Sequence, residues 1–148
     1  LTLDALRRED EIFLPLWEED YVLCVPVGHP LASRERLPLA ELQHYDFIEC
    51  PPCEAHQQTI GLLACDRLTL NLVAKAESKG LVMALVLAGV GISFLPDGLV
   101  DDEPGLRTVA VSGPRMFRRI GLCYPAHQTL NPALRDLIPE LASRGASW

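Results

Sequence analysis

Cysteine is the residue type with the most evident chemistry in this sequence, and two cysteines lie close together. Cys50 and Cys53 flank Pro51 and Pro52 in the stretch DFIECPPCEAHQQTI. A pair with this spacing, between a strand and a helix, can form a redox-active dithiol because a helix N-terminus stabilises a thiolate and lowers its pKa. The local pattern therefore admits thiol oxidoreductase chemistry.

The rest of the chain does not fit a thiol oxidoreductase. Thioredoxin-like folds place this motif early in the chain, behind one βα unit. They also need a cis-proline loop that faces the motif, and none of the other prolines can be assigned to such a loop. The prolines between the cysteines stiffen the turn and can aim the two sulfurs apart. Five cysteines, scattered at positions 24, 50, 53, 65 and 123, are more typical of reduced thiols than of a disulfide framework. We therefore expect Cys50 and Cys53 to be reduced.

A zinc site would need His56 and Cys65 in addition to the cysteine pair, since thiolate and imidazole are suitable zinc ligands. On a helix that starts near Cys53, Cys65 would lie about 18 Å away at 1.5 Å per residue, too far to share one tetrahedron. Three donors remain, so the sequence predicts no metal site.

The backbone of the same segment offers a different chemistry. The first turn of a helix has unpaired N–H groups and a partial positive charge, and it can bind a carboxylate or a phosphate. Here that turn would follow the carboxyl end of a strand, where open α/β sheets bind ligands. Glu54 would place an acidic side chain in this predicted anion-binding turn. It either caps the turn or favours a ligand with a cationic or hydroxyl group.

Strands and helices alternate along the chain, which predicts an α/β architecture. The expected strands cover residues 21–27, 45–50, 68–76, 91–96, 106–111 and 118–125, and the expected helices cover 38–43, 53–64, 77–89 and 131–143. An acidic triplet, Glu18 to Asp20, should separate the first of these strands from the earlier apolar run FLPLW. Because that run has no partner of its own, we expect the chain to be an excerpt of a larger protein.

Charge and hydropathy exclude two classes of partner. The net charge of −7 repels a phosphate backbone, and we expect Arg115, Arg118 and Arg119 to form a solvated edge. The densest apolar stretch, Leu81 to Ala88, is far shorter than the roughly 20 residues of a membrane span. The charged residues 1–11 do not look like a signal peptide. We expect a cytoplasmic location.

Four stretches, in this order and at these intervals, resemble the effector-binding domain of LysR-type transcriptional regulators. They are PLWEEDYVLCVPVGHPLASRERLPLAEL, YDFIEC, LVMALVLAGVGISFLPD and LNPALRDLIPEL, and they span about residues 15–141. The resemblance implies a fold like that of type 2 periplasmic binding proteins, with a ligand cleft between two α/β lobes joined by two crossing strands. One near-complete lobe and part of a second are expected. Residues 1–19 would be a remnant of lobe I and the first crossing strand, 20–114 lobe II, and 115–148 the return strand and C-terminal helix of lobe I.

The resemblance also implies the site residues. The effector cleft would be lined by Cys50, Pro51, Pro52, Cys53, Glu54, His56 and Gln57, with Ser93 and Phe94 on the facing strand. Side chains alternate along a strand, so only one of Ser93 and Phe94 should point inward. The hinge would comprise Leu16, Trp17, Phe117 and Arg118.

The expected function is sensing rather than catalysis, since no nucleophile, base and orienting group can be assembled from the serines and histidines. The domain would bind a small, anionic metabolite, without a cofactor, in a bacterial regulator. It would form homodimers or higher oligomers, with the helix over Leu81 to Leu87 as one candidate surface, and it would reach DNA only through a helix-turn-helix domain absent from this chain. The alternatives are a free-standing solute-binding domain and a CxxC thiol oxidoreductase.

Overall fold

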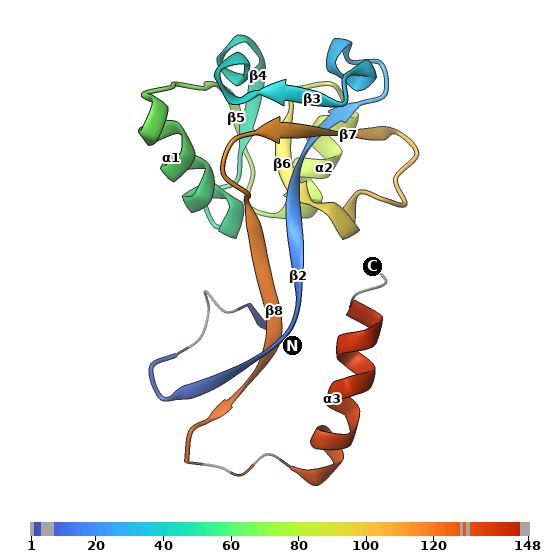
Figure 1. The fold of residues 1–148 in the computed structure, drawn as a ribbon. Helices are drawn as coiled ribbons and strands as arrows, with labels where there is room; N and C mark the ends of the chain where they lie inside the picture. The colour runs from blue at the N-terminus through green and yellow to red at the C-terminus, as the bar shows by residue number, and fades with distance from the viewer. Residues whose placement is uncertain (1, 4–7, 128, 130, 146–148) are drawn as a thin grey trace. The chain divides into compact units, whose positions relative to one another are not determined.

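The computed structural model describes residues 2–3, 8–127, 129 and 131–145 (Figure 1). Parts of the expected lobe I remnant and of the C-terminal segment lie outside these residues. The chain divides into two compact units: Leu1–Glu19 with Phe117–Trp148 form one, and Asp20–Met116 form the other. Each unit is described separately.

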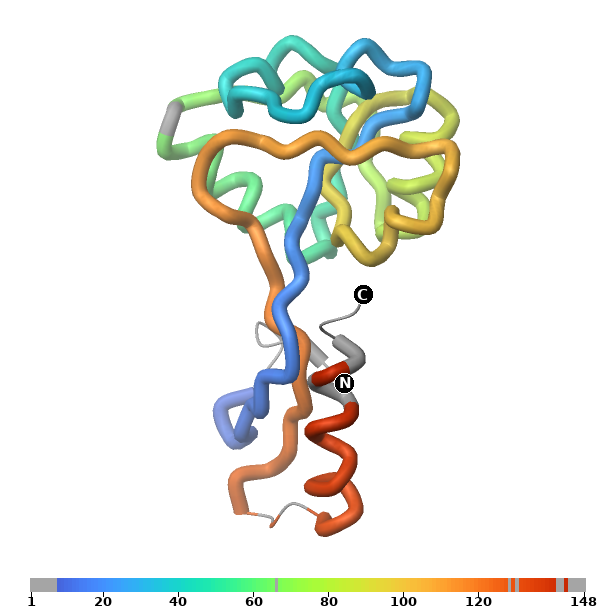
Figure 2. The backbone as a smooth tube through the Cα atoms, turned by 45° about the vertical axis from the view of Figure 1, so that its right-hand side comes forward, coloured from blue at the N-terminus to red at the C-terminus, as the bar shows by residue number. Residues whose placement is uncertain are grey.

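The unit Asp20–Met116 is built on the second half of strand β2 (Glu11–Pro26). Strand β6 (Ser93–Pro96) pairs with it antiparallel, with Cys24 opposite Ser93, and β7 (Leu106–Ser112) pairs antiparallel through Leu23 and Val109. Strand β3 (Arg36–Pro38) runs parallel to β7, and β4 (Asp46–Glu49) runs parallel to β5 (Asn71–Lys75). Figure 2 follows the backbone of this unit from blue β2 to orange β7. The strands predicted over 45–50, 68–76 and 91–96 are confirmed with shorter bounds. The strand predicted over 106–111 ends one residue later, and the strand predicted over 21–27 is the end of a strand that begins at Glu11.

The helices of this unit are α1 (Glu54–Asp66), α2 (Lys79–Leu87) and the 3₁₀ turns η2 (Pro30–Ser33), η3 (Leu39–His44) and η4 (Asp97–Leu99). The Ser78 hydroxyl accepts a hydrogen bond from the Leu81 N–H and begins α2, and Gly89, at φ +75°, follows its end. The helix predicted over residues 38–43 is a 3₁₀ helix rather than an α-helix.

Residues 23–25 of β2 are buried on both faces of the strand. Leu23 and Val25 belong to one apolar cluster with Leu42, whereas Cys24 belongs to a second cluster with Val86. Successive side chains of a strand point to opposite faces, so one strand contributes to both clusters. Burial also raises the pKa of Cys24 to about 12, which leaves its thiol protonated.

The other unit contains β1 (Thr2–Leu3), β8 (Phe117–Pro125) and α3 (Pro132–Gly145). Strand β1 pairs antiparallel with β8, and β8 neighbours β2. The Asn131 side chain accepts a hydrogen bond from the Ala133 N–H at 2.9 Å, so the predicted cap and helix are confirmed. Leu134 and Leu137 are partly exposed on this helix, and the side chain of Leu141, expected on the same face, lies outside those described.

The acidic triplet does not interrupt β2, which corrects the expectation of two separate runs. Its three side chains are paired with arginines: Glu18 with Arg119 at 3.2 Å, Glu19 with Arg118 at 2.6 Å and Asp20 with Arg115 at 2.6 Å. Charge neutralisation lets the strand continue. Arg115 and Arg119 are half-exposed as a solvated edge would be, but Arg118 and Glu19 are largely buried.

Of the helices that the structure describes, none combines the length and apolarity needed to cross a bilayer.

Candidate functional site

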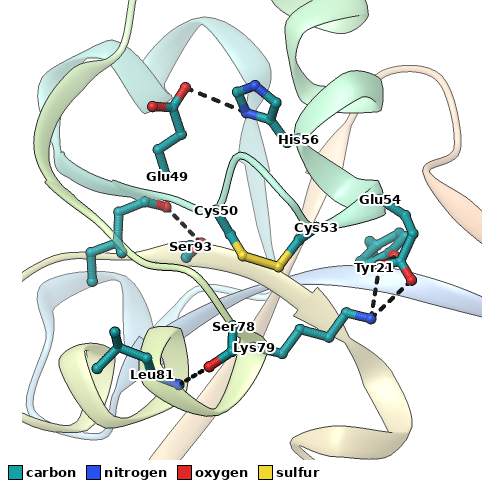
Figure 3. The surroundings of a disulfide bond; sticks show 11 residues. Tyr21, Glu49, Cys50, Cys53, Glu54, His56, Ser78, Lys79, Leu81 and Ser93 are labelled. Atoms are coloured by element: carbon teal, nitrogen blue, oxygen red, sulfur yellow. Dashed lines mark hydrogen bonds and ion pairs between the residues drawn. A yellow bond between two sulfur atoms is a disulfide. The ribbon is translucent and has the colours of Figure 1, made fainter.

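The turn between β4 and α1 is closed by a disulfide between Cys50 and Cys53 (Figure 3). The two Cα atoms lie 5.3 Å apart, and the Cys53 N–H donates a hydrogen bond to the Cys50 carbonyl oxygen at 2.9 Å. The expectation of two reduced thiols, aimed apart by the prolines, is therefore wrong for this structure. The prolines hold a tight turn that brings the sulfurs together.

The N-terminus of α1 holds the carboxylate of Glu54. Cys53 is the N-cap residue, and its side chain makes no capping hydrogen bond. Glu54 accepts a hydrogen bond from the Tyr21 hydroxyl at 3.1 Å and pairs with the Lys79 ammonium at 2.8 Å. The turn predicted to bind an anion thus already contains a carboxylate of the chain itself, paired with Lys79.

These contacts determine the ionisation of Glu54. Burial acts to raise the pKa of Glu54. However, the Lys79 ammonium, the residue's own backbone N–H and the Tyr21 hydroxyl outweigh burial and hold the pKa below its ordinary value. Glu54 is therefore a carboxylate at neutral pH and remains ion-paired with Lys79.

A cavity of about 340 Å³ lies between α1, β4, the segment 68–72 and the beginning of β6. Its walls are mostly apolar and include Phe47, Ile48, Ala55, Ile60, Leu63, Leu68, Leu70 and Phe94. Of the predicted site residues, Cys50, His56, Ser93 and Phe94 border it, whereas Pro51, Pro52, Cys53, Glu54 and Gln57 do not.

Both Ser93 and Phe94 border the cavity, although only one of them was expected to face the site. Strand β6 reaches the cavity with its first two residues rather than with one face, so alternation does not separate them. The Ser93 hydroxyl donates to the Ile48 carbonyl oxygen at 2.8 Å, and the Phe94 ring lies 5.9 Å from that of Phe47. Ser93 therefore ties β6 to β4.

The cavity has a polar border formed by Glu49 and His56. His56 Nδ1 lies 3.3 Å from Glu49 Oε1, and Lys75 Nζ lies 3.1 Å from Glu49 Oε2. The side chains of Glu49 and His56 are 16% and 15% exposed, whereas Lys75 is 71% exposed. Figure 3 shows Glu49 and His56 on one side of the disulfide and Tyr21, Glu54 and Lys79 on the other. The turn thus separates two polar clusters.

Sequence reasoning missed Tyr21, Glu49 and Lys79. Glu49 was the last polar residue of a predicted strand, and Lys79 was one of only two lysines in the chain and followed a helix start signal. Both positions could have been found from these signals. Tyr21 could not, because it precedes Glu54 by 33 residues and meets it only through the fold.

Within the described residues, no group of three or more histidine, cysteine or acidic side chains could hold a metal ion.

This architecture is the periplasmic-binding-protein-like α/β class of ligand-binding domain, since the solved structures it resembles are regulatory domains with that fold. A family model described as the LysR substrate binding domain matches residues 1–146, so the chain belongs to this family.

The relatives include whole regulators. The HTH-type transcriptional regulator YybE of Bacillus subtilis is 32% identical over 132 residues, covering 88% of this chain and 45% of the relative. The dual regulator OxyR of Escherichia coli is 29% identical over 147 residues, with coverages of 95% and 48%. The chain therefore spans about half the length of the curated relatives it matches.

Solved structures give the same result for the fold. A cysteine mutant of OxyR from Corynebacterium glutamicum has a TM-score of 0.77 at 25% identity and covers 99% of this chain and 47% of that one. The CcmR regulatory domain of Synechocystis, solved with 2-PG, has a TM-score of 0.80 at 18% identity, with coverages of 94% and 70%.

Proposed function

We propose that this chain is the effector-sensing part of a bacterial LysR-type transcriptional regulator and that it binds a small, anionic metabolite. The observation that carries the proposal is the first turn of α1, where Lys79 and Tyr21 hold the Glu54 carboxylate. An effector carboxylate or phosphate would take the place of Glu54 at Lys79 and at the N–H groups of the turn. The CcmR and QuiR regulatory domains, solved with 2-PG and with shikimate, support a small-molecule effector.

The proposed contacts extend from this turn to the neighbouring cavity. Its volume of about 340 Å³ suits a small metabolite, and its apolar walls would receive the uncharged part of the effector. The proposed site residues remain those predicted from the sequence, namely Cys50, Pro51, Pro52, Cys53, Glu54, His56, Gln57, Ser93 and Phe94, with Glu54 as the carboxylate that the effector would displace. We add Tyr21 and Lys79.

Signal transmission would use the two strands that connect the units. The chain passes from one unit to the other at residues 19–20 and 116–117. We propose Leu16, Trp17, Phe117 and Arg118 as the hinge, with lobe II over residues 20–114 and lobe I material in 1–19 and 115–148. An effector can bias a regulator only by binding one conformation more tightly than another.

The partners of the parent protein follow from the same proposal. It would work in the bacterial cytoplasm and bind DNA through a separate helix-turn-helix domain. It would act as a homodimer or a higher oligomer, and the exposed Leu81 and Leu87 of α2 support a subunit interface there. We propose no enzymatic activity, since the relatives are transcriptional regulators.

Native mass spectrometry of the full-length protein tests the effector proposal. We expect a co-purified small molecule that is released on denaturation. Lys79→Gln should lower its occupancy, whereas Arg34→Gln, which removes the same charge from the exposed Arg34–Glu41 pair, should not. Amide exchange at residues 54–57 should be slower in loaded protein than in stripped protein. Equal exchange rates would show that the effector does not bind at this turn.

A further inference from the structure

We infer that the cavity between α1, β4 and β6 binds a small apolar amine, whose ammonium group donates to the buried carboxylate of Glu49. The inference deepens the proposed function by naming the chemistry of the effector part that enters the cavity, and in that respect it rests on that function. Three observations support it: a buried oxygen of Glu49 that accepts no hydrogen bond, a cavity wall with acceptors and without cations, and an apolar lining that includes two aromatic rings.

Glu49 supplies the acceptor for the ammonium group. It is the last residue of β4, and it borders the cavity. Its side chain is 16% exposed, and the Oε2 atom is buried and accepts no hydrogen bond from the described part of the chain. A buried charged oxygen of this kind is costly, because it has lost water without gaining a donor. A donor group on a ligand would therefore stabilise Oε2.

The basic neighbours of Glu49 leave this oxygen available to a ligand. Lys75 Nζ lies 3.1 Å from Oε2, but the Lys75 side chain is 71% exposed and the pair does not form a hydrogen bond. His56 Nδ1 lies 3.3 Å from the other oxygen, Oε1 (Figure 3). Exposed ion pairs are weak because water screens them, so an ammonium group inside the cavity can replace Lys75 at little cost.

The other polar groups of the cavity wall also favour a donor. Thr59 and Ser93 border the cavity. Their hydroxyls already donate, each at 2.8 Å from a backbone carbonyl oxygen, so only their acceptor lone pairs are left for a ligand. Neither lysine nor arginine occurs among the described residues that line the cavity. A positively charged donor fits this wall, and a carboxylate inside the cavity does not.

The apolar lining defines the body of the ligand. Phe47 and Phe94 are 4% and 6% exposed, and their ring centroids lie 5.9 Å apart. Aromatic rings attract an ammonium group to their faces and pack against an apolar chain or ring. The volume of about 340 Å³ suits a molecule of the size of a phenylalkylamine. The cavity therefore fits an amine on an aromatic or aliphatic body.

Calorimetric titration of the full-length protein with two probes of similar shape tests the ligand class. At neutral pH phenethylamine is protonated, and it should bind at least about tenfold more tightly than phenethyl alcohol. The difference is expected because only the amine brings a charged donor to Glu49. Equal affinities, tighter binding of the alcohol, or no binding of the amine would overturn the inference.

Substitution of Glu49 tests the assigned acceptor. Glu49→Gln keeps the shape of the side chain and removes its charge, so it should weaken amine binding at least about tenfold and alcohol binding less than about threefold. Glu41→Gln is the matched control, because it removes the same charge from the exposed Arg34–Glu41 pair, and Glu41 does not line the cavity. It should change neither affinity. An unchanged amine affinity in Glu49→Gln would contradict the role of Glu49.

A second pair of variants locates the binding site without altering Glu49. Ala64 borders the cavity and is exposed on α1, so Ala64→Phe can narrow the cavity without changing a buried residue. This variant should weaken the binding of both probes. Cys65→Phe, at the next exposed position and outside the cavity wall, should weaken neither. Binding that is the same in the parent and in Ala64→Phe would show that the amine binds elsewhere.

The outcome for the cavity can be separated from the outcome for the proposed function. Neither probe contains an anionic group, so the titrations do not depend on a carboxylate or phosphate at Lys79. Amine binding by a protein that co-purifies with no metabolite would refute the proposed function and leave this inference standing. A co-purified anionic metabolite, with no binding of phenethylamine, would refute this inference alone.

Discussion

Replacing Lys79 with methionine tests how the N-terminus of α1 is stabilised. The ammonium lies 2.8 Å from Glu54, and the Lys79 and Glu54 side chains are 26% and 18% exposed. Exposed ion pairs contribute about 0–1 kcal/mol, and removing one partner of a fully buried pair costs about 3–5 kcal/mol. This pair lies between these limits, and the Tyr21 hydroxyl still donates to the carboxylate in the variant. We expect Lys79→Met to lower the free energy of unfolding by about 2 kcal/mol.

Urea denaturation at neutral pH measures this loss. Arg34→Met is the matched control, because it breaks an ion pair whose partners are both exposed, and its effect should be much smaller. A double-mutant cycle with Glu54→Gln should give a coupling energy of about 1–2 kcal/mol between the two side chains. Equal destabilisation by Lys79→Met and Arg34→Met would show that burial does not strengthen the Glu54 pair.

The same variant has a predictable pH dependence. The pKa of Glu54 is lowered in the folded protein, so its contribution to stability is complete above the ordinary carboxyl pKa and is lost as the pH falls through the lowered value. The difference between the parent and Lys79→Met should therefore be largest near neutrality and should shrink below about pH 4. A deficit that stays constant down to acid pH would mean that the methionine acts through packing and not through the charge of Glu54.

Three further substitutions, two of them with a control variant, test the packing and the start of α2. Leu42→Ala removes a fully buried side chain and should cost about 3 kcal/mol in urea denaturation. Val27→Ala, at a 49% exposed position, should change stability by less than about 0.5 kcal/mol. Ser78→Ala removes the N-cap of α2 and should cost about 1 kcal/mol in the same measurement, with faster amide exchange in the first turn of α2; an unchanged midpoint would contradict the capping role. Gly91→Ala would place a Cβ 2.8 Å from a backbone oxygen of β4 and should lower the thermal midpoint, at a cost of about 1–3 kcal/mol. Gly28→Ala is the control, because a Cβ there would meet nothing within 4 Å, and it should be neutral. Equal midpoints for the two variants would refute the predicted clash.

Local sequence signals predicted most of the secondary structure. Helix α2 follows from a serine cap and a closing glycine, and α3 from Asn131 and Pro132, because caps act within a few residues of the backbone that they satisfy. The family resemblance added the fold class, which the family match and the solved relatives confirm. The turn at residues 50–57 was also identified from the sequence, since a strand, two prolines and a helix start are consecutive there.

Contacts between segments distant in the sequence could not be predicted from local sequence signals. The acidic triplet was expected to break a strand, and only the return of the chain about a hundred residues later supplies Arg115, Arg118 and Arg119 to neutralise it. The partners of Glu54, Tyr21 and Lys79, lie 33 and 25 residues away along the chain. Side-chain pairing of this kind depends on topology and register, which no local pattern encodes.

The cysteine pair shows the limit of what the sequence alone can predict. Spacing identified Cys50 and Cys53 as candidates for thiol chemistry, because the types and the order of residues are sufficient for that. Whether the sulfurs meet depends on the path of the two prolines and on a backbone hydrogen bond, and their environments depend on β4, α1 and the cluster beneath them. Sequence thus defined the elements and the candidate chemistry, and three-dimensional packing decided which groups are paired, buried or accessible.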